Sequence, residues 1–363
     1  MIALSEQDRA GVDAAIAASL ERLQERSGPL GEGAVALAEA AAAAGEKGKR
    51  LRPALVVAAY RAFAPVDGEE PNAAAPSAAD EALWQVGAAF ELLHTGFVVH
   101  DDLIDRDVER RGAPNVAGRF RARAAAYGAS PDEIVIVGDA AAVLAGDLLL
   151  FEATRLIATA DASASVRATL FEILDDAILV SAAGELADVE NAARADVPDT
   201  DALLVAAHDK TAAYSFEAPL VAGAALAGAS VGTRDALAAA AADLGLAFQL
   251  VDDLIGTFGS RSQAGREPGA DLRESKRTPL IGLARRTGAW PRVSSAIALA
   301  YTGPVAVRRA QEELEASGAR EDLVALVRSS LENARAQAAS PDLSPAAAAL
   351  IGDIAAAIEG RVP

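Results

Sequence analysis

The chain has 363 residues, no cysteine and a formal net charge of −19. The absence of cysteine excludes disulfides and thiolate zinc sites, and the negative charge argues against nucleic-acid binding, which needs a positive surface. Hydrophobic residues make up 52% of the chain, many of them alanine. Because alanine is the best helix former, this composition predicts an all-α fold.

Helical spacing and helix-breaking residues divide the chain into short-linked helices, and no strand pattern or repeat is sustained. The predicted helices are 5–26, 32–44, 53–62, 80–107, 139–159, 165–189, 201–227 and 233–257, followed by three more. Segments 64–79 and 259–271 read as surface loops, and 45–53 and 109–115 as basic turns. The N-terminus lacks the order of a signal peptide. Apolar runs such as 221–229 are shorter than the roughly 20 residues of a membrane span. We therefore expect a cytoplasmic protein without a membrane span.

The most distinctive segment reads His-Asp-Asp-Leu-Ile-Asp-Arg-Asp over residues 100–107. Residues four apart share a helix face, so Asp101 and Asp105 point the same way, with Asp102 beside them. Carboxylates this close repel each other. Mg²⁺ compensates by joining one or two carboxylates to a substrate phosphate. The flanking residues are apolar, and aspartates are almost never buried without partners, so a metal site is favoured over a solvated face.

A second acidic pair, Asp252 and Asp253, also lies among apolar residues. Basic residues gather at 48–52, at 110–111, at Lys210 and at 276–277. The planar fork of arginine donates two parallel hydrogen bonds to a phosphate. Two acidic helix segments with separate basic clusters indicate a metal-held diphosphate, whereas Arg50 and Arg277 taken alone fit ordinary surface charge.

With these motifs the chain resembles the trans-isoprenyl diphosphate synthases, also called polyprenyl synthetases. The matching segments run in the family's order from Lys49 to Pro279, about two thirds of the chain. They are residues 48–53, His94, 101–105, 110–114, 210–212, 248–253 and 271–279. The resemblance implies an isoprenoid-synthase-type helical bundle around a deep central cavity, one domain over residues 1–363, and a homodimer.

The resemblance also implies head-to-tail condensation of isopentenyl diphosphate with dimethylallyl, geranyl or farnesyl diphosphate, with three Mg²⁺ ions. The implied metal ligands are Asp101, Asp105 and Asp252, with Asp102 and Asp253 completing the acidic motifs. The implied partners of the allylic diphosphate are Arg110, Lys210 and Lys276, and those of isopentenyl diphosphate are Gly48, Lys49, Arg52, His94 and Arg111. Thr211 and Gln249 offer oxygen dipoles to the allylic cation. The departing diphosphate takes the proton in family members, so no side chain is nominated as general base.

Two positions depart from the family pattern. The second motif commonly ends in a third aspartate, where this chain has Gly256, and the family's usual loop lysine is replaced by Arg266. Asp252 is still expected to bind the metal, and the missing third carboxylate allows a weaker affinity for it. Arginine keeps the charge of lysine but not its geometry.

The product length is expected to depend on residues one turn before the first motif. Bulky residues there shorten the product in the family. Gly96 is expected to open the path and Phe97 to obstruct part of it, although core packing explains Phe97 equally well. The prediction is geranylgeranyl diphosphate, with farnesyl diphosphate as the alternative.

Two rival functions remain. A terpene cyclase would leave Lys49, Arg52, His94 and Arg111 unexplained, and its usual second motif is not seen here. A noncatalytic subunit of a prenyl synthase usually loses its acidic motifs, whereas this chain keeps the first.

Overall fold

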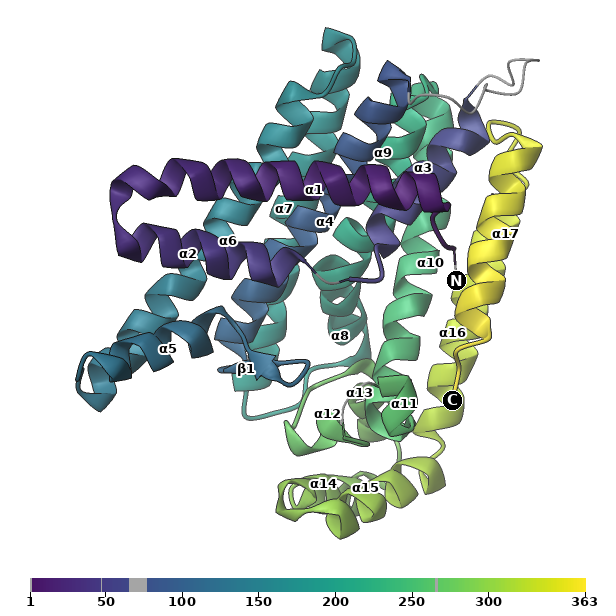
Figure 1. The fold of residues 1–363 in the computed structure, drawn as a ribbon. Helices are drawn as coiled ribbons and strands as arrows, with labels where there is room; N and C mark the ends of the chain where they lie inside the picture. Colours follow the sequence, from purple (N-terminus) through teal and green to yellow (C-terminus); the bar gives the residue numbers. More distant parts are fainter. Residues whose placement is uncertain (1, 47, 65–76, 265–266) are drawn as a thin grey trace. The chain divides into compact units, whose positions relative to one another are not determined.

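The structure, a computed structural model, describes residues 2–46, 48–64, 77–264 and 267–363 (Figure 1). Within these ranges the regular structure is helical apart from one two-stranded ladder, β1 (Glu109–Arg110) with β2 (Ala113–Pro114). The predicted all-α class is confirmed. The ladder coincides with the predicted basic turn at 109–115.

The chain forms two compact units. The N-terminal unit contains residues 3–172 and 222–228, and the C-terminal unit contains chiefly 173–221 and 229–363. Helices α7 (Ala164–Ala193) and α9 (Ala218–Leu226) contribute residues to both units.

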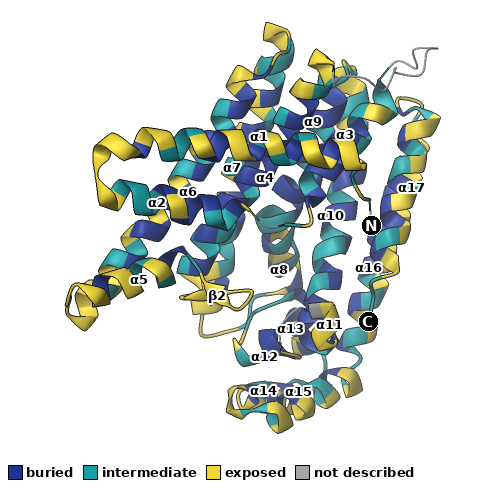
Figure 2. Cartoon of the chain, viewed as in Figure 1, coloured by how far each residue is buried: buried dark blue, intermediate teal, exposed yellow. Residues whose placement is uncertain are grey.

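Helix α4 (Ala78–Ile104) is the central helix of the N-terminal unit. It packs on the other long helices of that unit, which are α1 (Glu6–Ser27), α2 (Glu32–Gly45), α3 (Leu51–Phe63) and α6 (Pro131–Thr159). Its middle is buried on all sides (Figure 2), as the continuous apolar sequence predicts. The Ser77 hydroxyl accepts a hydrogen bond from the Asp80 amide, and the Asp80 carboxylate accepts one from the Ser77 amide. This capping box fixes the start of α4.

Two predictions about the helices of this unit were wrong. Helix α6 begins at Pro131, eight residues before the predicted start, because Ser130 and Glu133 form a second capping box. Helix α5 (Val116–Ala126) was not predicted, although Asn115 caps it by accepting a hydrogen bond from the Gly118 amide at 2.9 Å. Both starts carry side-chain signals that the apolar spacing alone does not reveal.

Helix α10 (Val231–Phe258) organises the C-terminal unit. The elements packed on it are η2 (His208–Glu217), α8 (Thr200–Ala207), α11 (Arg261–Ala264), α12 (Ala270–Arg273), α13 (Pro279–Arg285), α16 (Ala319–Gln337) and α17 (Pro345–Glu359). Helices α14 (Trp290–Ile297) and α15 (Pro304–Ala316) follow α13, so the described residues after α10 hold more than the three predicted helices.

The predicted helix 201–227 is interrupted, because η2 is a π-helix between α8 and α9. Part of the predicted loop 259–271 is helical, as α11 and α12 show. Residues 65–76 of the predicted loop 64–79 lie outside the described residues, as does Arg266.

Helices α4 and α6 are long and apolar enough to cross a membrane by length and composition alone. The apolar window of α4 is mostly inside the protein, as expected of a core helix, whereas only 33% of the α6 window is buried. Several large apolar side chains of α6 are exposed, among them Ile136, Leu144 and Phe151. Asp139, Asp147 and Glu152 interrupt the apolar runs of α6, so the sequence shows no uninterrupted run that marks this surface.

Candidate functional site

The first acidic motif lies where α4 ends. The helix stops at Ile104, three residues before the predicted end, and the Asp105 amide donates to the Asp101 carbonyl at 2.8 Å. Arg106 then takes a left-handed conformation with φ of 61°. The motif therefore occupies a helix end and a turn, and Asp105 is exposed while the side chain of Asp101 is 29% exposed.

Asp102 has a different environment from Asp101, and its side chain is only 6% exposed. Arg110 Nε donates to Asp102 Oδ1 at 2.7 Å, and Arg110 Nη2 lies 3.6 Å from Asp101 Oδ2. Burial raises the pKa of Asp102, against the opposing charge and hydrogen bond of Arg110. Asp102 thus anchors the arginine of β1 to the helix end, whereas Asp101 and Asp105 face outward.

His94 lies two turns before this motif on α4, in a strongly positive environment. Its pKa is well below the ordinary value of 6.5, first because of burial and then because of the charges of Arg52, Arg110 and Arg111. The structure therefore brings together four residues that the resemblance assigns to diphosphate binding. Such a cluster of cations around a neutral imidazole suits a polyanion.

The basic turn before α3 lies close to α4 at Gly48. A Cβ atom at Gly48 would lie 2.6 Å from Glu91 Oε1, so a larger residue at this position would have to displace the Glu91 side chain of α4. Lys49 beside it is exposed. The turn thus presents Lys49 outward and Arg52, in the first turn of α3, toward the His94 region.

Arg50 is not the surface charge that the sequence suggested. Its side chain is 5% exposed, and it donates to Asp13 at 2.8 Å and to Glu91 at 3.1 Å. It also donates to the carbonyls of Gly45 and Glu46, at 3.1 and 3.3 Å. Arg50 therefore holds the turn in its left-handed conformation, with φ of 55°.

The second acidic motif lies on α10 in the C-terminal unit, and its two aspartates also differ. The side chain of Asp252 is 39% exposed, whereas Asp253 is 7% exposed. Gln249 Nε2 donates to Asp253 Oδ1 at 2.9 Å. Burial, followed by the nearby charge of Asp271, raises the pKa of Asp253 well above its ordinary value. The side-chain nitrogen of Gln249 is thus hydrogen-bonded to Asp253, and its side-chain oxygen points away from that carboxylate.

Gly256, where the family commonly has a third aspartate, is explained by Asp271. A Cβ atom at Gly256 would lie 1.8 Å from Asp271 Oδ2, and Asp271 is 6% exposed. The carboxylate that the motif lacks on α10 is therefore matched by one that approaches the same helix position from α12. The Lys276 amide donates to the Asp271 carbonyl at 3.0 Å, which places Lys276 directly after this contact.

Lys210 and Thr211 lie on the π-helical element η2. Lys210 Nζ donates to Glu185 at 3.0 Å and to Asp188 at 2.9 Å, both on α7. Short π-helical stretches within α-helices are frequent at functional sites. Glu185 and Asp188 were not among the predicted site residues. The signal that could have indicated them is their i, i+3 spacing, which places two acidic side chains on one face of α7.

The surroundings of Gly96 differ from the expected open path. A Cβ atom there would lie 3.0 Å from Leu150 Cδ2 and 3.2 Å from the Gly146 carbonyl oxygen, both on α6. Gly96 therefore serves the close packing of α4 on α6 and leaves no open space on that side. Phe97, the next residue, is partly exposed.

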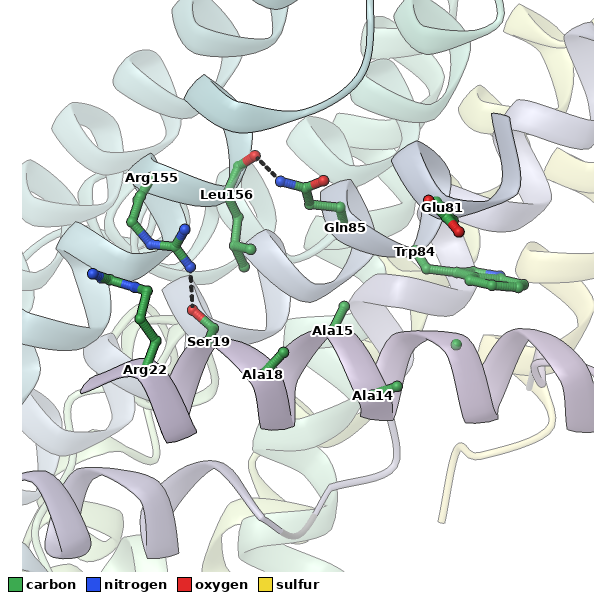
Figure 3. A pocket seen from close by; sticks show the side chains of 11 residues that line it. Ala14, Ala15, Ala18, Ser19, Arg22, Glu81, Trp84, Gln85, Arg155 and Leu156 are labelled. Atoms are coloured by element: carbon green, nitrogen blue, oxygen red, sulfur yellow. Dashed lines mark hydrogen bonds between the residues drawn. The ribbon is translucent and has the colours of Figure 1, made fainter. Parts of the chain in front are cut away.

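A pocket of about 500 Å³ lies among α1, α4 and α6 (Figure 3). Arg22 and Arg155 meet at one end of it, near Ser19, and Trp84 lies at the other. Gln85 in this pocket precedes Asp101 by sixteen residues, roughly 24 Å along a helix. The pocket is therefore separate from the first acidic motif.

The donor atoms at both acidic motifs are carboxylate oxygens, which suit Mg²⁺. Among the described residues, no group of three or more Asp, Glu, His or Cys side chains could by itself enclose a metal ion. This fits the usual binding of Mg²⁺, through one or two carboxylates with substrate phosphates, rather than a cage made only of protein.

Comparison with known proteins agrees with the motifs. A family model described as polyprenyl synthetase matches residues 35–298. The (2E,6E)-farnesyl diphosphate synthase of Mycobacterium tuberculosis (strain ATCC 25618 / H37Rv) is 38% identical over 231 residues, which are 64% of this chain and 55% of that protein. The octaprenyl diphosphate synthase of Escherichia coli (strain K12) is 31% identical over 279 residues, which are 77% of this chain and 72% of that protein.

A solved structure extends the likeness to the whole chain. It is described as a geranylgeranyl pyrophosphate synthase from Corynebacterium glutamicum complexed with isoprenyl diphosphate and magnesium, and the TM-score is 0.86 at 26% identity. The comparison covers 99% of this chain and 100% of that one. The resemblance seen in the motifs is thus confirmed: the chain belongs to the polyprenyl synthetase family and has its all-α fold.

Proposed function

We propose that the protein is a Mg²⁺-dependent prenyltransferase that condenses isopentenyl diphosphate head-to-tail with allylic diphosphates. The observation that carries this proposal is the N-terminal unit's cluster of Arg52, His94, Arg110 and Arg111 beside a carboxylate-bearing helix end. The arginines there are suited to bind a polyanion, and the carboxylates at the helix end are suited to bind a divalent cation. The matched relatives are prenyl diphosphate synthases by name, although the farnesyl synthase alignment spans only 55% of that relative.

In this proposal Asp101, Asp105 and Asp252 hold the metal ions, three in number. When bound, Mg²⁺ stabilises the negative charge that develops on the departing diphosphate. Arg110, Lys210, Arg266 and Lys276 add fixed positive charge for the allylic diphosphate, which is the electrostatic contribution that usually dominates. Gly48, Lys49, Arg52, His94 and Arg111 hold isopentenyl diphosphate. Thr211 and Gln249 orient oxygen dipoles toward the allylic cation.

Asp102 and Asp253 have supporting roles in this assignment. Both side chains are buried, which leaves them less accessible to a metal ion than Asp101 and Asp252. Asp102 instead orients Arg110, and Asp253 orients Gln249. The departing diphosphate takes the proton, and apolar helix walls keep water from the cation.

Further parts of the proposal follow from the family. One synthetase domain, a central cavity for the growing chain, a homodimer and a cytoplasmic location without a membrane span are all predictions. The exposed apolar side chains of α6 support the homodimer, because a second copy would cover them. The product proposed is geranylgeranyl diphosphate, with farnesyl diphosphate as the alternative. With Gly96 packed against α6, Phe97 is the remaining candidate for limiting the length.

The deciding experiment incubates the purified chain with Mg²⁺, isopentenyl diphosphate and, separately, dimethylallyl, geranyl or farnesyl diphosphate. Chromatography of the dephosphorylated products should give geranylgeraniol as the dominant peak. Farnesol alone would keep the chemistry and show that the path closes earlier. We expect Asp101→Asn to lower the rate by about 10²–10³-fold, the usual effect of removing one electrostatic contribution.

Asp132→Asn, in the exposed first turn of α6, is the matched control and should leave the rate within about twofold. A folded protein that condenses no starter would favour the two rivals. A cyclase would convert an allylic diphosphate without isopentenyl diphosphate. A noncatalytic subunit would be insensitive to charge reversal at Asp101.

A further inference from the structure

The segment after α17 lies on the face of α10 that carries the second acidic motif. Arg361 forms an ion pair with Asp252, and its Cζ atom lies 4.3 Å from the centroid of the Phe248 ring. Phe248 and Asp252 are four residues apart and so share a face of α10. A single guanidinium therefore covers both the apolar and the acidic side chain at this position.

Main-chain contacts hold the segment in register. The Arg361 amide donates to the Ile358 carbonyl at 3.0 Å. Arg320 Nη2 donates to the Pro363 oxygen at 2.8 Å, and its Cζ atom lies 4.8 Å from the Phe258 ring centroid. Two arginines thus tie residues 361–363 to aromatic rings of α10, one near its end and one at the motif.

The ion pair between Arg361 and Asp252 is nevertheless weak enough for another cation to replace Arg361. The side chains of Arg361 and Asp252 remain 25% and 39% exposed, and partly exposed ion pairs contribute little. Arg361 Nη1 is buried and has no hydrogen-bond acceptor within the part of the chain that the structure describes. A guanidinium with an unsatisfied N–H group can leave this position at modest cost.

We propose that Arg361 is a displaceable counter-ion of the second acidic motif: it competes with a divalent cation for the Asp252 carboxylate, and cation binding releases residues 361–363 from α10. This inference rests on the proposed function, in which Asp252 is a metal ligand. A guanidinium and a divalent cation on one carboxylate would repel each other strongly at about 4 Å, so occupancy by one opposes occupancy by the other. The affinity of the site for metal is thereby coupled to the position of the segment.

The test measures Mn²⁺ binding to the full chain by electron paramagnetic resonance, with inorganic diphosphate at a fixed concentration. We expect Arg361→Gln to bind Mn²⁺ about five- to tenfold more tightly than the wild type, which corresponds to roughly 1–1.4 kcal/mol. Arg335→Gln is the matched control, because it also removes one positive charge. Arg335 pairs with Glu359 on the exposed side of α16 and α17, at 2.8 Å. This variant should stay within about twofold of the wild type.

A double-mutant cycle assigns the effect to one carboxylate. In the Asp252→Asn background, Arg361→Gln should no longer change Mn²⁺ affinity, because the shared ligand is gone. The inference is overturned if Arg361→Gln binds Mn²⁺ as weakly as the wild type, or more weakly. Weaker binding would mean that the arginine positions Asp252 for the metal instead of competing with it.

Hydrogen exchange provides a second readout that does not depend on activity. Adding Mn²⁺ and diphosphate to the wild type should accelerate exchange at the amides of Arg361 and Val362, which bond to carbonyls of α17. No acceleration would contradict release of the segment. Product formation by the wild type, measured on the same preparation, separates the two failures. If the protein forms product but Arg361 does not compete with the metal, this inference alone is overturned. If Arg361 competes with the metal but no product forms, the proposed reaction alone is overturned.

Discussion

At the scale of single residues, burial divides each pair of adjacent aspartates into two roles. The first member, Asp101 or Asp252, keeps 29% or 39% of its side chain exposed, and the second, Asp102 or Asp253, is buried. Successive residues on a helix point about 100° apart, so both members cannot face the same ligand. The exposed member can therefore reach a metal ion, and the buried member supports a neighbouring arginine or glutamine.

His94 gives a pH dependence whose direction follows from its environment. Its pKa in the folded protein lies below 6.5, the value expected when the chain is unfolded. Between these two values the unfolded chain binds more protons, so stability rises with pH. The stabilising contribution is complete above pH 6.5 and is lost as the pH falls toward the folded value.

We expect the unfolding free energy of the wild type, relative to His94→Gln, to fall as the pH drops from 7.5 to 5.5. The slope should reach at most about 1.4 kcal/mol per pH unit for one proton. Urea denaturation of both proteins at each pH measures it. Inorganic diphosphate should reduce the slope, because an anion offsets the arginine charges that lower this pKa. A difference between the two proteins that does not vary with pH would contradict the assigned environment.

At the scale of helical elements, the close packing of neighbouring helices determines which residues the chain tolerates where it departs from the family pattern. A Cβ atom at Gly256 of α10 would lie 1.8 Å from the Asp271 carboxylate of α12. We therefore expect Gly256→Asp, which restores the common motif, to lower the unfolding free energy by about 3 kcal/mol or more. Overpacking and an added charge beside buried carboxylates both contribute to this cost. Urea denaturation with an unchanged m-value would measure it.

Gly352→Ala in α17 is the control, since a Cβ atom there has nothing within 4 Å. Alanine is a better helix former than glycine, so this variant should be as stable as the wild type or up to about 1 kcal/mol more stable. Adding Asp271→Ala to Gly256→Asp should recover part of the loss by relieving the contact. Full stability of Gly256→Asp alone would show that α12 moves away from α10 without cost.

The same scale shows why some elements could not be predicted. The spacing of apolar residues predicted one helix over 201–227, and this pattern did not reveal the π-helical stretch within it. It is the close approach of neighbours that marks this element. A Cβ atom at Gly245 of α10 would lie 2.6 Å from Ala212 Cβ, and one at Gly184 of α7 would lie 2.2 Å from the Lys210 amide nitrogen. Such contacts depend on residues far apart in the sequence.

At the scale of the whole chain, the sequence predicted the all-α class, the core helix α4 and both acidic motifs, because apolar periodicity and motif spacing are local. It did not predict the burial of Arg50, whose partners Asp13 and Glu91 come from other helices. Nor did it indicate Arg361, more than a hundred residues from its partner Asp252. What was missed depends on tertiary contacts that leave no local signal.

The exposed side of α6 also bears on the whole molecule, because exposed apolar side chains favour association with another surface. Ile136, Leu144 and Phe151 are 65%, 53% and 60% exposed, and their spacing of seven to eight residues places them on one face. Exposed apolar side chains gathered on one helix face are typical of an interaction site. A second copy of the chain would cover it through a two-fold interface, the most common arrangement in soluble oligomers.

We therefore expect sedimentation equilibrium to show a dimer at micromolar concentration, and Leu144→Glu with Phe151→Glu to weaken it at least about 100-fold. Two buried charges without partners at an interface cost several kcal/mol, whereas on an exposed monomer face they cost little. The unfolding free energy of the monomer should thus change by less than about 1 kcal/mol. Leu299→Glu with Val305→Glu, at side chains 56% and 72% exposed, introduces the same charges away from α6 and should leave the dimer intact. A wild type that sediments as a monomer, or that pellets with lipid vesicles, would assign this face to something other than a second copy.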